Sequence, residues 1–312
     1  DKHKGNRKQI SVLGQESNPD TWRLCKMNLA IRGIAHDLGQ KNASTFTEDQ
    51  HKDKTVNYIM ANPPFNLKNW RGEDELINDP RWSAYNVPRS SNANYAWILH
   101  MLSKLDVNNG IAGFLLANGA LNDEDEYENR KKLIENDKVE AIIVLPRDMF
   151  YTTDISVTLW ILNNNKKAGT VNGRKVRSRK NEILFVDLRT WNENIESYKL
   201  DKGTKKKVVL SEQQIEKVKD IYFKWQSEET DGTHYEVPEL YRSVGLEEIK
   251  DNNFALTPSK YIEFIDHDLD IDYEKEMTRI QNEMKEIMVQ EEKSQQMLKE
   301  AFEGIGYGIT KN

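Results

Sequence analysis

The sequence lacks most features that mark secreted, membrane-spanning or metal-dependent proteins. It has one cysteine, Cys25, and no stretch that approaches the ~18 apolar residues of a membrane helix. A single cysteine excludes a disulfide within the chain, which fits a cytoplasmic protein, and residues 1–4 do not begin a signal peptide. None of the six histidines stands at ligand spacing from another histidine, a cysteine or a carboxylate, so we expect no metal site.

Outside the C-terminal tail the chain also has little excess of charge of either sign. The formal net charge is −6, but residues 263–303 alone hold thirteen acidic and five basic side chains, which leaves about +2 for the rest of the chain. The net charge of residues outside this tail therefore does not disfavour binding to DNA, and it also gives no sign of strong unaided binding.

The most informative stretch is Asn-Pro-Pro-Phe, residues 62–65, which follows the apolar run 56–61. A short apolar run closed by two prolines predicts a buried strand that stops abruptly. The carboxyl ends of strands are where α/β folds place their ligands. Two prolines fix two φ angles and contribute no backbone N–H, so the turn presents bare carbonyl groups.

These four residues offer a specific chemistry. The Asn62 side-chain carbonyl and the Pro63 backbone carbonyl are two acceptors on a rigid frame, and Phe65 adds a flat apolar face. Two acceptors on one planar amino group draw its lone pair out of conjugation, and an aromatic ring can stack on an extruded nucleobase. We interpret the turn as a device for alkylating an exocyclic or amide nitrogen. The plain alternative is a strand-terminating turn, because Asn and Pro are common turn residues.

Alternating strands and helices over residues 10–163 predict an α/β core. The strand at 10–16 ends in Glu16, and a carboxylate at a strand tip suits the two hydroxyls of a ribose. Consecutive strands without a full helix between them, as at 139–162, predict an antiparallel edge strand. The remaining expected elements are a helix after Pro19, a short strand within 38–46, helices at 94–102, 123–135 and 211–225, strands at 111–117, 139–146, 157–162 and 182–187, and a long helix from 273.

Three further segments invite a functional and a structural interpretation. The irregular segment 66–89 is typical of a substrate-facing loop, within which Trp70 and Trp82 favour packing over stacking on nucleic acid. His100, on an apolar helix, is expected to be a hydrogen-bonded core histidine. The basic loop 166–180 suits either a solvated loop or a phosphate contact, and we weight the two equally.

Several segments, in the right order, resemble the modification (M) subunit of type I restriction–modification systems. They are residues 14–19 with 27–34, 61–66 around the turn, 117–121, and 145–160. The resemblance is strong from about residue 10 to 165 and looser through Tyr261 to the tail. It implies a Rossmann-like methyltransferase sheet with an antiparallel edge strand, followed by a C-terminal helical tail, that uses S-adenosylmethionine to methylate adenine N6 in DNA.

The resemblance also implies roles for individual residues. The catalytic residues, which hold the target adenine, would be Asn62, Pro63, Pro64 and Phe65. The residues that bind S-adenosylmethionine would be Glu16, with the ribose, and Asn18, Ser44 and Asn62. The residues that stack on the target base would be Phe65, Phe150 and Tyr151.

The resemblance further implies an assembly. Two M subunits work with one DNA-specificity subunit on double-stranded DNA, and a restriction subunit joins for cleavage. Residues 1–165 would be the catalytic core, incomplete at its N-terminus, 166–262 its remainder with the basic loop, and 263–312 a helical tail that docks on the specificity subunit.

The chain departs from the family pattern at two points. Ser44 stands where the family commonly carries an acid for the adenine of the cofactor, which gives up a charge-assisted hydrogen bond. No Gly-x-Gly precedes Gly14, so we expect these residues to be the C-terminal portion of a longer protein that alone binds S-adenosylmethionine weakly or not at all. Alternatives are a methylase-like scaffold without activity, or methylation of cytosine N4 or a glutamine amide.

Overall fold

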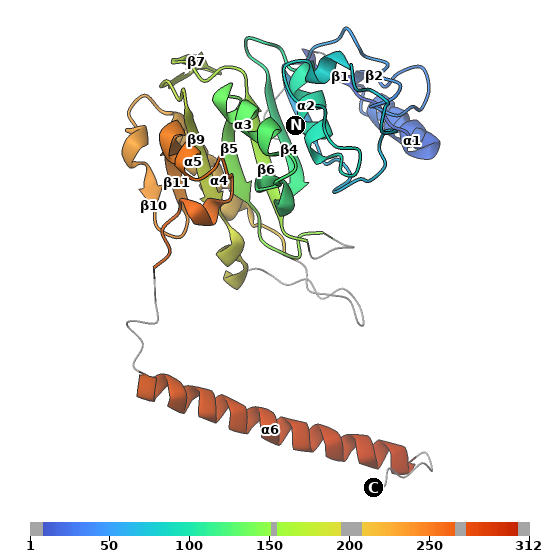
Figure 1. Ribbon diagram of the computed structural model, residues 1–312. Helices are drawn as coiled ribbons and strands as arrows, with labels where there is room; N and C mark the ends of the chain where they lie inside the picture. The colour runs from blue at the N-terminus through green and yellow to red at the C-terminus, as the bar shows by residue number, and fades with distance from the viewer. Residues whose placement is uncertain (1–8, 151–154, 195–207, 266–272, 305–312) are drawn as a thin grey trace. The chain divides into compact units, whose positions relative to one another are not determined.

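The computed structural model of the chain describes residues 9–150, 155–194, 208–265 and 273–304 (Figure 1). The chain divides into two compact units, residues 1–263 and 264–312. The helices are α1 Pro19–Ile31, α2 Asn94–Lys104, α3 Tyr127–Glu135, α4 Glu212–Gln226, α5 Leu246–Asp251 and α6 Tyr273–Gly304. The strands are β1 Ser11–Leu13, β2 Ala35–Asp37, β3 Tyr58–Ala61, β4 Ile111–Ala117, β5 Val139–Val144, β6 Val157–Asn163, β7 Gly169–Val171, β8 Arg174–Val176, β9 Glu182–Asp187, β10 Glu236–Val237 and β11 Tyr241–Gly245.

A seven-stranded sheet in the order β10-β11-β9-β5-β6-β4-β3 forms the centre of the first unit (Figure 1). The parallel pairs are β3 with β4 and β5 with β9, whereas β6 runs antiparallel to both of its neighbours. This confirms the predicted α/β class and the antiparallel strand after 139–146. That strand, β6, lies inside the sheet because β9, β11 and β10 extend the sheet beyond β5; the antiparallel strand at the edge is β10.

Helices cover both faces of the sheet, because successive residues of a strand point to opposite sides. On β5, Ile142 and Val144 join the core formed with α2, α3 and α5. The intervening Ala141 and Ile143 join a smaller core under α4. A serine cap with a reciprocal glutamine begins α4, as its sequence predicts.

The strand before the Asn-Pro-Pro-Phe turn differs from the prediction. We expected a buried strand over 56–61, but β3 is the edge strand at the opposite end of the sheet from β10, and Tyr58 and Met60 are 67% and 92% exposed. Only the alternate residues Ile59 and Ala61 pack against the core. The reason is that, among the described residues, β3 pairs with a strand on one side only, which is β4, and that α2 packs on only one of its two faces.

Two other predictions need correction. The strand expected within 38–46 is wrong: β2 ends at Asp37 and pairs in parallel with β1, and a loop follows it. Polar side chains, described below, form hydrogen bonds with the backbone groups of this loop, which a neighbouring strand would otherwise form. The helix expected at 123–135 begins at Tyr127 and is not simply exposed, because its own residues Leu133 and Ile134 are buried.

The irregular segment 66–93 packs against α2 through its tryptophans. Trp70 and Trp82 are 7% and 2% exposed, and their rings meet edge to face at 5.8 Å. This confirms packing as their role. No helix of the described residues combines the length and the apolar character that crossing a membrane would require.

Candidate active site

The Asn-Pro-Pro-Phe turn leaves the carboxyl end of β3, as the sequence predicts. The ladder between β3 and β4 ends where Ala61 lies opposite Phe114, so the turn begins where backbone pairing stops. Pro63 is buried, Phe65 is half-buried and Asn62 is exposed. The buried proline holds the turn against the protein while the asparagine amide stays accessible to a ligand.

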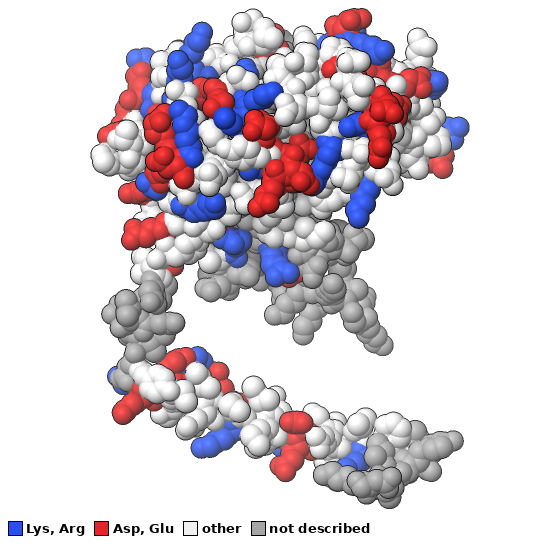
Figure 2. Space-filling view, in the orientation of Figure 1, with Lys and Arg blue, Asp and Glu red and all other residues white. Residues whose placement is uncertain are grey.

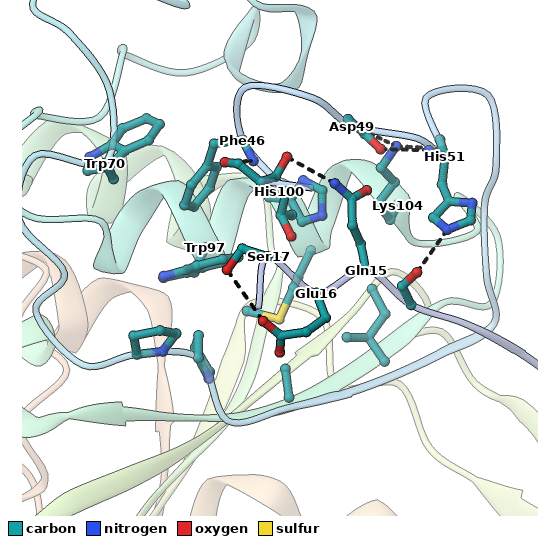
Figure 3. Close-up of a pocket in the computed structure, with 18 of the residues that line it drawn as sticks. Gln15, Glu16, Ser17, Phe46, Asp49, His51, Trp70, Trp97, His100 and Lys104 are labelled. Atoms are coloured by element: carbon teal, nitrogen blue, oxygen red, sulfur yellow. Dashed lines mark hydrogen bonds and ion pairs between the residues drawn. The ribbon is translucent and has the colours of Figure 1, made fainter. Parts of the chain in front are cut away.

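A cavity of about 640 Å³ lies beside this turn (Figure 3). It is lined by the end of β1, the loop after β2, the end of β3 with its turn, and one side of α2. Glu16, Ser44 and Asn62 come from three of these segments and share the cavity with Pro63 and Pro64. The volume is that of a small-molecule site.

Glu16 directs a half-buried carboxylate into this cavity from the end of β1. Its Oε1 accepts hydrogen bonds from the Asn18 backbone N–H at 2.8 Å and from the Ser17 hydroxyl at 3.3 Å. Both contacts use the same oxygen, so Oε2 has no hydrogen-bond partner among the residues that the structure describes. The carboxylate is therefore held by one oxygen and can accept from a ligand with the other.

Asn18 itself serves the helix that follows. Its Oδ1 accepts from the backbone N–H groups of Asp20 and Thr21, at 2.9 and 3.0 Å, and so caps α1. It is not among the residues that line the cavity. A cofactor contact from Asn18 stays a prediction, and its side-chain carbonyl is already engaged.

Ser44 reaches the cavity from a tight turn after β2. Its Oγ accepts from the backbone N–H groups of Phe46 and Thr47, both at 3.3 Å, so the hydroxyl proton is what Ser44 can donate to a ligand. Its carbonyl accepts from Gln15 Nε2 at 2.9 Å. That amide also donates to the carbonyls of Ala43 and Glu48, at 3.2 and 2.7 Å.

Gln15 is a site residue that sequence reasoning missed. Besides its donated bonds, its Oε1 accepts from the Gln50 backbone N–H at 3.0 Å, so one side chain ties the Ser44 loop to the end of β1. The available signal was its position next to Glu16. Gln50 acts in the same way on the far side of the loop, where its Oε1 accepts from the backbone of Gln40 at 2.8 Å.

Aromatic side chains form the opposite wall of the cavity (Figure 3). The Phe46 ring lies 4.5 Å from Trp70 and 4.2 Å from Trp97, between ring centroids. His100 stands edge-on to both Phe46 and Trp97, at 6.3 and 6.5 Å. The sequence did not predict that these rings meet, because they come from a loop, a second loop and α2.

His100 is a hydrogen-bonded histidine, as expected, and it also lines the cavity. Burial and the neighbouring Arg81 lower the pKa of His100 to about 4. Arg81 Nη1 donates to His100 Nδ1 at 3.2 Å, which places the imidazole proton on Nε2. Arg81 also donates to the Thr45 and Phe46 carbonyls, at 3.0 and 2.6 Å, and so joins α2 to the Ser44 loop.

A buried ion pair closes the far end of the cavity. Lys104 Nζ lies 2.7 Å from Asp49 Oδ2 and donates to the His51 carbonyl at 2.7 Å. Burial alone would raise the pKa of Asp49, but hydrogen bonds from Lys104 and the His51 backbone outweigh it and hold that pKa below its usual value. The pair fixes the loop to the C-terminal end of α2.

Two predicted stacking residues lie together outside the cavity lining. The rings of Phe65 and Phe150 meet edge to face, with centroids 5.9 Å apart and planes at 86°. The third, Tyr151, lies outside the described residues. In the described part of the chain no group of three or more His, Cys, Asp or Glu side chains could hold a metal ion.

Comparison with known proteins assigns the chain to a family. A family model described as N-6 DNA Methylase matches residues 1–269. The chain is 39% identical over 309 residues to the type I restriction enzyme HindI methylase subunit of Haemophilus influenzae, with 98% of this chain and 64% of the relative covered. It is 32% identical to the MjaIX methylase subunit of Methanocaldococcus jannaschii, and that match covers 96% of this chain and 51% of the relative. The chain thus spans between half and two thirds of the length of these relatives.

Among solved structures, the fold is similar to the type I restriction-modification system methyltransferase subunit from Streptococcus thermophilus. The TM-score is 0.65 at 25% sequence identity, and the match covers 80% of this chain and 48% of that one. The similarity supports the α/β fold described above.

Proposed function

This chain belongs to the N-6 DNA methylase family, and we propose that it transfers a methyl group from S-adenosylmethionine to adenine N6 in DNA, as the modification subunit of a type I restriction–modification complex. One observation carries the proposal: the Asn-Pro-Pro-Phe turn at the end of β3 opens onto a cavity shared by Glu16 and Ser44. Acceptors for an amino group and polar groups for a nucleoside cofactor therefore meet in one place.

The residues present suit the nucleoside part of S-adenosylmethionine. The Oε2 atom of Glu16 would accept from the ribose hydroxyls, and the hydroxyl of Ser44 would donate to the adenine ring. The aromatic wall at Phe46 would bound that ring. When bound, the cofactor supplies an electrophilic methyl group.

The turn would act on the other substrate, a base extruded from the duplex. The Asn62 side-chain carbonyl and the Pro63 carbonyl would each accept one proton of the adenine amino group. This would localise the nitrogen lone pair, which would form the new N–C bond as the methyl–sulfur bond of the cofactor breaks and its electron pair stays on sulfur; one amino proton would then pass to water. Phe65, with Phe150 beside it, would stack on the base. Catalysis then rests on alignment, without a covalent intermediate on the protein.

The remaining subunits of such a complex belong to the proposal as well. We assign DNA recognition to a specificity subunit, to which α6 would dock, together with a second modification subunit and a restriction subunit. No residue of α6 is buried, and its exposed apolar side chains include Met284, Ile287 and Met288. Such a face suits packing on another helix.

The test is Asn62→Ala in the full-length subunit, assembled with its partners, using tritiated cofactor and double-stranded DNA. Asn57→Ala is the matched control, because Asn57 is an exposed asparagine that immediately precedes the same strand. We expect Asn62→Ala to abolish methylation of N6-adenine in digested DNA and the control to leave it unchanged. Wild-type methylation by Asn62→Ala would overturn the proposal, and mass spectrometry of the nucleosides separates adenine from cytosine as the target.

A further inference from the structure

Asn66, the residue that leaves the Asn-Pro-Pro-Phe turn, has a special backbone conformation. Its φ is +52°, in the left-handed region that asparagine adopts more readily than other residues with a side chain. Phe65 and Asn66 lie in a turn of the backbone. Contacts from outside the turn also hold this residue.

Three asparagine side chains provide that contact. The Asn66 backbone N–H donates to Asn94 Oδ1 at 3.1 Å, and Asn94 Nδ2 donates back to Asn66 Oδ1 at 2.9 Å. Asn92 Nδ2 donates to the same Asn66 oxygen at 3.2 Å, and Asn92 Oδ1 accepts from the Asn94 backbone N–H at 2.9 Å. The reciprocal pair between Asn66 and Asn94 fixes both the position and the orientation of Asn66.

The far side of this contact is part of the core. Asn94 is the first residue of α2 and is only 2% exposed, and the next residue, Tyr95, is fully buried and donates to the Ala120 carbonyl at 2.9 Å. Two backbone bonds run alongside: Ala93 N–H to the Leu67 carbonyl at 2.9 Å and Asn69 N–H to the Ser90 carbonyl at 3.1 Å. The exit of the turn is therefore fastened to the most buried helix.

We propose that Asn66 and Asn94 form a clamp that positions the Asn-Pro-Pro-Phe turn, and that Asn94 is a positioning residue for methyl transfer. The ladder to β4 fixes the entrance of the turn at Ala61, and the clamp fixes its exit. Asn94 does not line the cavity, so it acts through Asn66 and not on a substrate. A displacement of about 1 Å of catalytic groups costs on the order of 10²-fold in rate. This inference rests on the proposed function.

The test measures methyl transfer to DNA by the full-length subunit in its assembled complex. We expect Asn94→Ala to lower kcat by about 30- to 100-fold and to change KM for DNA by less than about threefold, because binding surfaces remain while alignment is lost. Asn94→Asp should recover most of the loss. Its carboxylate still accepts from the Asn66 N–H, and the Asn66 amide can turn to donate to it.

A second variant and a matched control separate the clamp from general folding. Asn66→Gly keeps the left-handed backbone but removes the side-chain carbonyl, and should lower kcat by about tenfold. Asn172→Gly is the control, because Asn172 has a similar φ of +50°, is exposed between β7 and β8, and does not line the cavity. If Asn94→Ala does not fold, Asn66→Gly alone decides.

Two outcomes distinguish the clamp from the function on which it rests. Retention of kcat within threefold by Asn66→Gly and Asn94→Ala, while Asn62→Ala is inactive, would overturn the clamp and leave the methyltransferase. Full activity of Asn62→Ala would instead overturn the proposed function. Equal losses in Asn66→Gly and Asn172→Gly would also count against the clamp, because they would reflect a general effect of glycine on the backbone.

Discussion

Arg179 Nε donates to Glu140 Oε1 at 2.8 Å, and the two side chains are 1% and 0% exposed. Glu140 also accepts from Asn163, Tyr222 and Gln226, at 2.6, 2.8 and 3.2 Å. The carboxylate thus has several donors around it, as a buried charge requires. Arg179, although part of the basic loop, is therefore an internal anchor: its side chain is buried in an ion pair and is not accessible to a nucleic acid.

The other cations of this loop are largely engaged too. Lys166 is buried and pairs with Asp137 at 2.5 Å, and Arg177 pairs with Glu182 at 2.7 Å. Arg174 lies over the Phe223 ring at 3.7 Å. On the face seen in Figure 2, acidic and basic side chains alternate over the body. Contact with DNA by this loop remains a prediction, and Lys166 and Arg179 are poorly placed for it.

The first prediction concerns this anchor. Arg179→Ala should lower the free energy of unfolding by about 3–5 kcal/mol, because it leaves a buried carboxylate without its charged partner. Urea denaturation followed by circular dichroism measures the change. Lys175→Ala is the control: its ion pair with Glu228 is exposed and should contribute less than about 1 kcal/mol. Equal effects of the two substitutions would contradict a buried anchor.

The second prediction concerns pH. The pKa of His100 falls from its usual 6.5 to about 4 in the folded protein, so the unfolded chain binds more protons between these values. The contribution of His100 to stability is therefore complete above pH 6.5 and is lost as pH falls towards 4. Urea denaturation at pH 4.5 and pH 7 should show a smaller pH dependence for His100→Gln than for the unmodified protein. An unchanged dependence would show that His100 titrates normally.

The third prediction concerns Ser44. Ser44→Asp in the full-length subunit should tighten S-adenosylmethionine binding by about five- to tenfold, because a carboxylate makes a stronger, charge-assisted hydrogen bond. The aspartate can still accept from the backbone of Phe46 and Thr47, so the turn is kept. Calorimetry measures the affinity. Thr47→Asp adds the same charge at an exposed position and should have no effect; tightening by both variants would indicate a non-specific charge effect.

The fourth prediction concerns residues 1–312 by themselves. Among the described residues β1 pairs with β2 and β3 pairs with β4, and no ladder joins β1 to β3. The two walls of the cavity are therefore connected by loops and side chains, such as Lys104 with Asp49. We expect S-adenosylmethionine to bind these residues weakly or not at all, and to bind the full-length subunit clearly. Micromolar binding to residues 1–312 in calorimetry would refute this.

Much of the fold was accessible from the sequence because it rests on local patterns. Apolar periodicity predicted β4, β5, β6 and β9, the helix α2, and the long helix α6. The serine cap of α4 and the asparagine cap of α1 are hydrogen bonds between residues two or three positions apart, so the local sequence indicates them. β2 was missed because Ala35-His36-Asp37 has no apolar alternation; it becomes a strand through pairing with β1.

The candidate site was predicted in part. The sequence pointed to Glu16, Ser44 and Asn62, and these three line one cavity. It did not point to Gln15, Arg81 or Lys104, whose polar groups hold the walls of that cavity together. Each makes its contacts with residues distant in the chain, so no spacing in the sequence reveals them.

The sequence by itself determined the local chemistry of this protein: a rigid turn of two prolines between an asparagine and a phenylalanine, at the end of an apolar strand. Those properties depend on fixed φ angles and on the groups that neighbouring residues carry. Only the tertiary structure decided that Asn94 meets Asn66, that Arg179 is buried against Glu140, and that Met60 is exposed. The reason is that burial and side-chain partners depend on which strands and helices pack together, and adjacent residues do not encode that packing.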